Sequence, residues 1–501
     1  MKRLDKEEPT SDIAAILDLR TRKLNEQPVR RKGSDYVLCW LMQALRAEEN
    51  PVLDAAIALG NDLGLPVVVL HTLENRYPYA SHRLHRFVLE ASWELEAGVQ
   101  ARGVRFARWV RRAGEAGGAV DLAAELAGRA AAVVVDDVPI FVTNEYAEVL
   151  SQRLKRAVFA VDACCAVPMN ALAELRDTTK AFRAAHTKLR PLHLNAELRQ
   201  APVLPVFDGD LGITPTSLEL DNIDLDALIR ETGVDMSVPP APGFLGGRSA
   251  ALARLEFAVR EVVPRYKWTR NNPALEDATA KLSPWLHFGV LSPREMARAV
   301  LEAEAEGKVH AAARWKFLDE TLTWREYYHH RARFESNWDR WEGLPEWARE
   351  TLQAHAADPR PNLYSLNELI HGETDDETWN VAHKQFLLDG WLNNNLRMYW
   401  VKQLLKWRET PQEAWATACY LNDRFSLDGR DASTYGGIRW GFGEGKKGYR
   451  EIDVYGEVMP KSDRALRKRE GVPEWLAEQA KREVYRVEVP GDEAAALGRY
   501  L

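Results

Sequence analysis

Two tryptophans in the segment 391–407 have a spacing that suits stepwise electron transfer. If this segment forms one helix, four side chains share a face at i, i+3, i+7 and i+10: Arg397, Trp400, Leu404 and Trp407. Seven residues of helix rise by about 10 Å, which leaves the two indole rings near edge contact. Ordinary helix packing gives the same stripe, so the spacing by itself leaves both interpretations open.

The part of the chain that must position these rings is expected to be helical. Beyond about residue 250, β-branched runs nearly vanish and amphipathic periods dominate, for example over 252–263 and 311–329. The chain holds 17 Trp, many of them between Trp315 and Trp440. An indole fills a large volume and its N–H needs a partner, so each Trp taken singly is expected to be a core residue.

The first third of the chain has a different pattern. Short β-branched runs alternate with helix-like stretches, and the runs cover 36–41, 66–71, 104–110, 132–135 and 157–161. This alternation predicts parallel crossovers, hence an open, Rossmann-like α/β sheet. No GxGxxG follows the first run, so that dinucleotide motif is not indicated. The strand ends are expected either to bind an accessory ligand or to serve only as scaffold.

Proline and glycine separate the two patterns. They punctuate the chain at Pro202, Pro205, Pro215, Pro239, Pro240, Pro242, Gly243, Gly246 and Gly247. We therefore predict an α/β domain over 1–169, a linker over 170–249 and an all-α domain over 250–501.

The composition is that of a folded protein, with 46% hydrophobic and 28% charged residues among 501. The formal net charge of -7 argues against a nucleic-acid partner, but basic residues outnumber acidic ones between Gly445 and Arg469. That segment could meet a phosphate backbone or form a solvated face. Its basic residues are Lys446, Lys447, Arg450, Lys461, Arg464, Arg467, Lys468 and Arg469.

The four cysteines form no CxxC pair and have no histidines at zinc spacing, so we expect neither a disulfide framework nor a metal site. The segment MKRLDKEEPTSD at the start is highly charged, and the longest apolar runs fall short of the roughly 20 residues of a membrane helix. A cytoplasmic protein without a membrane segment is expected. No long heptad stripe indicates a coiled coil, and we expect a monomer.

Four motifs stand in order in the second half of the chain. They are LSPWLHFG (282–289), TLTWREYY (321–328), LRMYW (396–400) and LNDRFSLDGRD (421–431). Together they resemble the photolyase/cryptochrome family, and in particular its class II cyclobutane pyrimidine dimer (CPD) photolyases. The segment LRAEENPVLDAA (45–56) shows a weaker likeness. The segment HKQFLLDGWLNNN (383–395) departs from the family pattern, in which this region is more basic.

The resemblance implies an FAD folded within the helical domain. Asn422 matches the residue whose amide faces N5 of the flavin, and Arg397 with Asp428 matches a pair that flanks the ring system. The plain alternatives are a turn residue for Asn422 and a surface ion pair for the other two. The positions matched to the cofactor are Tyr266, Thr279, Leu282, Ser283, Asn380, Arg397, Asn422, Asp428 and Asp431.

The cofactor diphosphate is expected at the turn before LSPWLHFG, near Thr279, Leu282 and Ser283. This chain has Ala280 and Lys281 where relatives often carry a small hydroxyl or a Gln-Ser pair. Ser283, which precedes Pro284, is equally a candidate N-cap.

Three tryptophans match the family's electron-transfer chain, which reduces the flavin from the surface: Trp379, Trp400 and Trp407. A lesion pocket is also implied, with Glu320 and Trp324 as a Glu/Trp pair one helical turn apart. An aromatic box accepts a dimer flipped from the duplex, because the dimer stacks and pairs poorly. An ion pair with Lys316 or Arg325 is the alternative role for Glu320. Further matched pocket positions are Arg270, Met398 and Trp440.

These matches predict light-driven repair of CPDs in DNA by an electron from reduced FAD. A blue-light sensor of the cryptochrome type is the first alternative, although only about 60 residues follow Trp440, which leaves little room for a regulatory tail. A (6-4) photoproduct photolyase is the second, and its pocket would need histidines, for which His287 and His383 are the candidates. A helical nucleotide-binding protein without flavin would make the motifs coincidental. An antenna chromophore in the α/β domain is left open.

Overall fold

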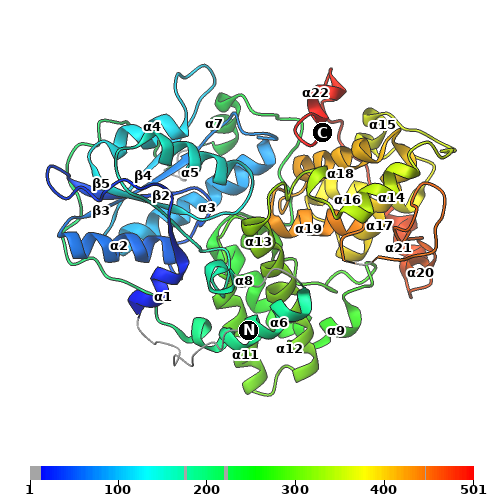
Figure 1. Ribbon diagram of the computed structural model, residues 1–501, viewed down its shortest axis with the longest axis horizontal. Helices are drawn as coiled ribbons and strands as arrows, with labels where there is room; N and C mark the ends of the chain where they lie inside the picture. Colours follow the sequence, from blue (N-terminus) through cyan, green and yellow to red (C-terminus); the bar gives the residue numbers. More distant parts are fainter. Residues whose placement is uncertain (1–12, 174–177, 219–223, 446) are drawn as a thin grey trace.

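The computed structural model describes residues 13–173, 178–218, 224–445 and 447–501. The charged segment 1–12 and Lys446, which entered the sequence analysis, lie outside these residues. The described chain has an α/β part and a helical part that lie side by side (Figure 1).

A six-stranded sheet organises the α/β part of the described chain. Its order is β1-β6-β5-β2-β3-β4. The bounds are β1 (Thr21–Lys23), β2 (Tyr36–Leu41), β3 (Val67–Leu73), β4 (Arg105–Val110), β5 (Ala130–Asp136) and β6 (Val158–Val161). Strands β2 to β6 are parallel, which confirms the predicted open parallel sheet. Every residue of β2, β3 and β5 is buried, as expected of strands covered on both faces.

The sheet also has an edge strand that the sequence analysis missed. β1 has the sequence TRK and pairs antiparallel with β6. Three polar residues carry no strand signal, and the tertiary structure places them. The preceding Arg20 is fully buried and donates to the backbone carbonyls of Asp162, Cys165 and Ala166, beyond the end of β6.

Helices cover both faces of the sheet. α2 (Pro51–Leu63) and α3 (His82–Ala101) pack on one face, and α4 (Ala119–Ala127) and α5 (Phe141–Arg153) pack on the other. Local sequence defines α2, because the Asn50 side chain accepts from two backbone N–H groups of its first turn and Gly64 ends it at a φ of 60°.

The segment predicted as a linker contains helices. These are η1 (Met169–Leu172), α6 (Thr179–Asn195) and α7 (Leu225–Thr232), which follow the sheet. Another helix, α1 (Ile13–Arg20), precedes the sheet. α6 contacts helices of the helical part, and α7 contacts α3. The division of the chain at 169 and 249 stays a prediction.

The rest of the described chain is helical, as predicted. Its elements are α8 (Arg248–Phe257), η2 (Ala258–Val262), η3 (Val263–Arg265), α9 (Tyr266–Thr269), α10 (Ser283–His287), α11 (Pro293–Ala305), α12 (Ala311–Leu318), η4 (Asp319–Trp324), α13 (Arg325–Phe334), η5 (Trp341–Gly343), α14 (Glu346–Ala354), α15 (Leu366–His371), α16 (Glu377–Asp389), α17 (Asn394–Trp407), α18 (Pro411–Phe425), α19 (Ala432–Gly441), α20 (Arg464–Arg467), α21 (Val472–Ala480) and α22 (Glu493–Leu497). α17 begins three residues later than the helix expected over 391–407, because Gly390 ends α16 at a φ of 62° and Asn393 caps α17.

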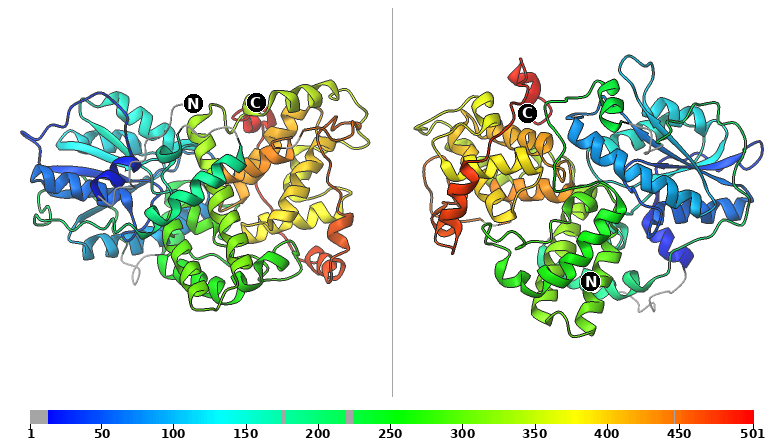
Figure 2. Two further views of the ribbon diagram at one scale, coloured as in Figure 1. Left: turned by 60° about the horizontal axis from the view of Figure 1, so that its bottom comes forward. Right: turned by 180° about the vertical axis from the view of Figure 1, so that it is seen from behind.

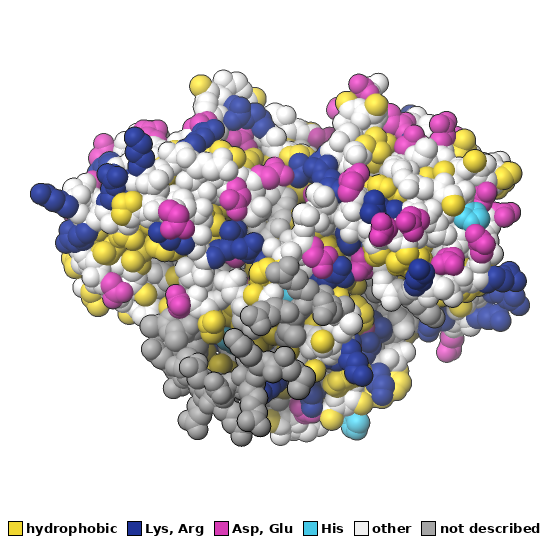
Figure 3. Space-filling view, in the orientation of Figure 1, with side chains coloured by type: hydrophobic (Ala, Val, Ile, Leu, Met, Phe, Trp, Pro, Cys, Tyr) yellow, Lys and Arg dark blue, Asp and Glu magenta, His cyan; other side chains and the backbone are white. Residues whose placement is uncertain are grey.

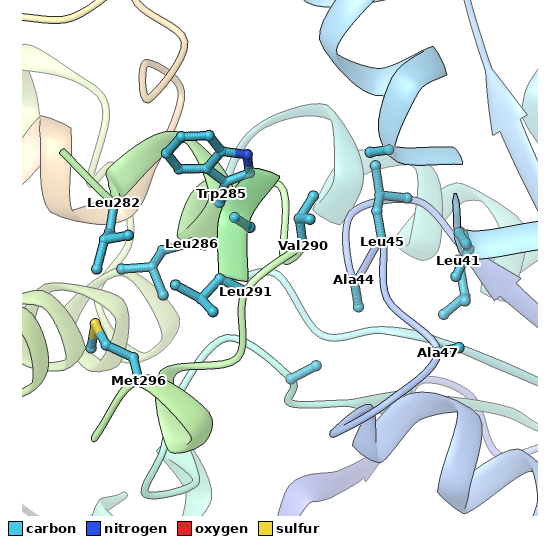
Figure 4. Packing of buried hydrophobic residues seen from close by; sticks show 14 of the residues in the cluster. Leu41, Ala44, Leu45, Ala47, Leu282, Trp285, Leu286, Val290, Leu291 and Met296 are labelled. Atoms are coloured by element: carbon cyan, nitrogen blue, oxygen red, sulfur yellow. The ribbon is translucent and has the colours of Figure 1, made fainter. Parts of the chain in front are cut away.

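The two parts share one hydrophobic core. The helices α8 to α13 lie between the sheet and the helices α14 to α21 (Figure 2). Residues beyond the end of β2, such as Ala44 and Leu45, belong to the same buried cluster as Trp285, Leu286 and the segment that follows α10 (Figure 4). Gly289 allows the close approach, because a Cβ there would lie 2.5 Å from the carbonyl oxygen of Gln43.

A second core fills the helical part between α14 and α19 and includes Trp379, Trp400 and Trp415. Burial of these indoles fixes how α16, α17 and α18 pack against one another. The sequence prediction that single tryptophans serve as core residues is therefore confirmed for these three.

Candidate functional site

A cavity of about 560 Å³ opens in the helical part. This volume lies within the roughly 300–1,000 Å³ of ligand-binding pockets. Its walls come from α9, from the turn before α10, from α12 with η4, from the start of α17 and from α19. The sequence-predicted residues that line it are Tyr266, Arg270, Thr279, Leu282, Ser283, Glu320, Trp324, Arg397, Met398, Asp428 and Trp440.

One part of the cavity wall is aromatic and holds a carboxylate between two cations. Glu320 and Trp324 lie in the π-helical turn η4, a wider turn often found at functional sites. Glu320 Oε1 lies 2.9 Å from Arg270 Nη2 and 2.5 Å from Lys316 Nζ. The Trp324 ring is 5.9 Å from that of Tyr328. Glu320 therefore forms the alternative ion pair with Lys316 and also lines the cavity.

Another part of the cavity wall is organised by a buried ion pair. Asp428 Oδ1 accepts from Arg397 Nη2 at 2.9 Å, and Asp428 Oδ2 accepts from the Ser283 hydroxyl at 2.6 Å. Both charged side chains are less than a tenth exposed, so a surface ion pair is the wrong interpretation. Burial alone would raise the pKa of Asp428, but Arg397 and the hydroxyls of Ser283 and Ser426 hold it below its usual value. Ser283 is not the N-cap of α10, because Leu282 occupies that position.

Two buried polar atoms near this ion pair have no hydrogen-bond partner among the described residues. They are Asn422 Oδ1 and Arg397 Nε. Asn422 lies in α18 with its side-chain nitrogen donating to Asp423 at 2.8 Å, so it is a buried helical residue and not a turn residue. A buried acceptor without a donor costs free energy. Arg397 lines the cavity, so its Nε is available to a bound molecule.

Three of the residues matched to the cofactor lie outside the lining of the cavity. Asn380 exchanges hydrogen bonds with Thr374. Asp431 caps α19, and its Oδ2 lies 3.2 Å from His287 Nδ1 and 3.6 Å from His329 Nε2. Burial alone would raise the pKa of Asp431, but His329, His287 and Arg325 lower it well below its usual range. Asn422 is the third.

Part of the cavity wall was not predicted from the sequence. Lys316 was considered only as an ion-pair partner, although its position four residues before Glu320 on a helix is a signal that could have indicated a shared site. Lys281 lines the cavity with a φ of 53°, a strained value for a lysine, and its ammonium lies 5.8 Å from the Trp391 ring. Burial lowers the pKa of Lys281. No sequence signal indicated Trp391.

The three matched tryptophans form a continuous contact chain. Trp379 of α16 lies between the two indoles of α17, with ring centroids 5.8 Å from Trp400 and 5.1 Å from Trp407. Trp379 and Trp400 are fully buried, whereas Trp407 is 7% exposed and borders an open surface pocket. The inner end approaches the cavity, because Phe386 contacts both the Trp400 ring and the guanidinium of the cavity residue Arg397. The helical spacing found the two end members, and the fold inserts the third between them.

The two candidate histidines of a (6-4) pocket lie elsewhere. His287 lines a separate cavity of about 100 Å³ at the carboxyl ends of the strands, together with Gln43 and Tyr146. His383 is fully buried beside the tryptophan chain. Within the part of the chain that the structure describes, the lining of the large cavity contains no histidine.

The described part of the basic segment, residues 447–469, flanks the site. Lys461 Nζ donates to Asn395 at the start of α17, and Asn272, two residues beyond the cavity residue Arg270, donates to the carbonyl of Glu470. Part of its charge is neutralised, since Arg467 pairs with Glu377 and Asp463. Lys and Arg side chains gather at the edge of the molecule near α20 (Figure 3).

Two further features concern the described residues only. No helix among them is both long and apolar enough to cross a lipid bilayer. They contain no group of three or more His, Cys, Asp or Glu side chains placed to hold a metal ion. The four cysteines are free thiols.

The architecture is that of solved photolyases and cryptochromes. A bacterial class III photolyase from Agrobacterium tumefaciens superposes with a TM-score of 0.62 and 17% identity, over 93% of this chain and 96% of that protein. A Synechocystis cryptochrome gives the same TM-score and identity over 93% and 88%. At such identities the likeness shows the fold alone.

Sequence relatives define the family. A deoxyribodipyrimidine photo-lyase from Oryza sativa is 30% identical over 443 residues, which cover 85% of this chain and 84% of that protein. One from Methanothermobacter thermautotrophicus is 28% identical over 91% and 97%. No family model matches the chain. The chain belongs to the photolyase/cryptochrome family.

Proposed function

We propose that the protein is a class II CPD photolyase, which binds FAD and repairs CPDs in DNA with light. One observation carries the proposal: most of the residues matched to the cofactor and all five matched to the lesion line the same cavity. An enzyme that passes an electron from a flavin to a dimer needs both in one water-poor space.

The residues of the site fit an FAD. Asn422 Oδ1 and Arg397 Nε are buried polar atoms without partners, and a flavin offers an N5–H donor and ring acceptors that would satisfy them. Asp428 would hold Arg397 in place. Ser283, Thr279 and the ammonium of Lys281 line the cavity where the diphosphate is expected, and Lys281 compensates for the hydroxyl that relatives carry.

The residues matched to the lesion suit an extruded dimer. Reduced FAD, when bound, would supply the photoexcited electron that opens the cyclobutane ring. Trp324, Trp440 and Met398 would provide apolar contact and exclude water. Glu320 would accept a hydrogen bond from a pyrimidine N–H, while Arg270 and Lys316 keep its carboxylate oriented.

The contact order of the tryptophans supports a route for reducing equivalents. An electron would enter at Trp407, which borders the surface pocket, and reach the cavity through Trp379 and Trp400. Each step joins rings whose centroids are less than 6 Å apart.

A CPD is favoured over a (6-4) photoproduct as the substrate. A (6-4) enzyme would need histidines in its lesion pocket, and the described lining of the cavity has none. A carboxylate, two cations and aromatic rings remain, which can bind the base edges and ring faces of a CPD.

Three further expectations belong to the proposal. The edge formed by the basic segment 445–469 would meet the DNA backbone. The free thiols suit a reducing cytoplasm. An antenna chromophore in the α/β part stays a prediction. The strand-end cavity has a volume of about 100 Å³, which is small against the roughly 300–1,000 Å³ of ligand pockets.

The deciding experiment uses purified protein that is reduced anaerobically and mixed with dimer-containing DNA, with and without blue light. Loss of CPDs only in the light is expected. Trp400→Phe should block photoreduction of oxidised FAD yet spare repair by chemically reduced protein. A flavoprotein that photoreduces but leaves every CPD intact would favour the cryptochrome or (6-4) interpretation, and a colourless protein would refute the proposal.

A further inference from the structure

One histidine lies against two members of the tryptophan chain. His383 of α16 is fully buried, and its ring is parallel to those of Trp379 and Trp400, with centroids 5.1 Å and 6.1 Å away. Neither the cavity nor the solvent reaches it. Its polar atoms must therefore serve the protein interior, where an unpaired imidazole nitrogen would cost free energy.

The hydrogen bonds of His383 fix which nitrogen carries the proton. Nε2 lies 2.8 Å from the carbonyl oxygen of Ile370, which can only accept, so Nε2 is protonated. Nδ1 then presents its lone pair, and the indole N–H of Trp400 donates to it at 3.3 Å. Burial lowers the pKa of His383 to about 4, so the imidazole is neutral near pH 7 and this acceptor is available.

The other buried indole lacks such a base. Trp379 Nε1 donates to the backbone carbonyl of Trp400 at 2.9 Å, and an amide oxygen is a very weak base. Within the described residues, Trp400 is thus the one member of the tryptophan chain whose indole N–H donates to a side chain that can take up a proton.

We infer that His383 tunes Trp400 as a redox centre, by accepting the indole hydrogen bond that stabilises the oxidised ring. His383 acts through Trp400 and is thus a positioning residue. The inference rests on the proposed function, in which photoexcited oxidised flavin is the oxidant of Trp400.

The step balances without a further reactant. Trp400 loses one electron to the photoexcited flavin and becomes an indole radical cation, whose N–H is far more acidic than that of the neutral ring. The proton shifts along the hydrogen bond toward His383 Nδ1, which spreads the new positive charge in a site that water does not reach. When Trp379 returns one electron to Trp400, the proton returns to the indole. The hole has then moved one ring outward, and His383 is unchanged.

The test compares three variants of the FAD-loaded, full-length protein by flash absorption. His383→Leu removes the acceptor, whereas His383→Asn keeps an amide oxygen near the position of Nδ1. Phe425→Leu is the matched control, because the buried Phe425 also contacts His383, with ring centroids 5.8 Å apart, but through its ring alone. The measured quantity is the rate at which the tryptophan radical appears after the flash.

We expect the radical to appear about tenfold more slowly in His383→Leu, since a hydrogen bond to a charged group is lost. His383→Asn should recover most of the rate, and Phe425→Leu should stay near wild type. In D₂O the wild-type protein should show slower radical formation, a measurement that needs no variant and that a purely structural role would not affect.

Wild-type rates in a folded His383→Leu, or the absence of a solvent isotope effect in the wild type, would overturn the inference alone. A wild-type protein that binds FAD but forms no tryptophan radical would instead overturn the electron-transfer route of the proposed function, and the inference with it.

Discussion

Fully or partly buried carboxylates occur in both halves of the molecule, but they have different partners. Asp136 and Asp162 lie at the ends of β5 and β6, and in the described structure their hydrogen-bond donors are backbone N–H groups. Asp136 accepts from Met42, Gln43 and Ala44. Asp162 accepts from Cys164, Cys165 and Met169. We call these the strand-end carboxylates. In the helical part, Glu320 and Asp428 interact with the side chains of Arg270, Lys316, Arg397, Ser283 and Ser426. We call these the cavity carboxylates.

The difference separates scaffold from site. Backbone N–H groups cannot move away without distorting a strand end, and both strand-end carboxylates are buried, so they are committed to the scaffold. Side-chain partners can rotate and exchange, so the cavity carboxylates can transfer their cations to an incoming molecule. In a sheet of this type ligands commonly bind at the carboxyl ends of the strands, yet here those positions are used for structure.

The largest effect is expected from removing a strand-end carboxylate. Asp136→Ala leaves three backbone N–H groups near β2 without their acceptor, and should lower the free energy of unfolding by about 3–5 kcal/mol. Chemical denaturation followed by circular dichroism measures the loss. Asp136→Asn, which keeps one acceptor, should lose less, and a stability within about 1 kcal/mol of wild type for the alanine variant would contradict the scaffold role.

Removing a cavity carboxylate should affect the cofactor more than the fold. Asp428→Ala leaves the buried guanidinium of Arg397 without a counter-charge and should weaken FAD binding by about 100-fold. Titration of the apoprotein with FAD, followed by flavin fluorescence, gives the affinity. Asp389→Ala, which breaks a pair with Arg482 on the surface of the helical part, is the control and should bind FAD normally.

A smaller effect, on the repair rate, is expected from changing Glu320, which is matched to the lesion. Glu320→Gln keeps the shape of the side chain but removes the charge, and should lower the light-dependent repair rate about 10–100-fold. The unfolding free energy should change by less than about 1 kcal/mol, since Glu320 is partly exposed to the cavity. Equal repair by Glu320→Gln and wild type under identical illumination would remove Glu320 from the lesion site.

The smallest effect is a pH dependence of stability from a strand-end carboxylate. Burial raises the pKa of Asp162 to about 6, so the folded chain holds this proton more tightly than the unfolded chain. Between about pH 4 and pH 6 this group should therefore make the unfolding free energy fall as pH rises, by about 1–2 kcal/mol. Asp162→Asn should remove this component. A wild-type curve parallel to that of the variant across this window would show that Asp162 does not contribute.

Much of the fold could be predicted because it is encoded locally. The β-branched runs found the five parallel strands, since β-branched side chains pack well on a pleated surface. The edge strand β1 was missed, because Thr21–Lys23 pairs only once Arg20 is buried against the end of β6. The α-helical period found Trp400 and Trp407 on one face, but period says nothing about Trp379, which comes from another helix.

The sequence by itself determined the class of each half, the positions of most strands, the two tryptophans of α17 and the motifs that place the chain in its family, because these depend on periods and patterns over short stretches. Only the tertiary structure decided which polar groups are saturated and which stay available. It pairs Asp428 with Arg397, leaves Asn422 Oδ1 without a donor and moves His383 from a candidate pocket residue to the side of Trp400. Hydrogen-bond partners come from segments far apart in the chain, and burial determines how strongly each pair interacts.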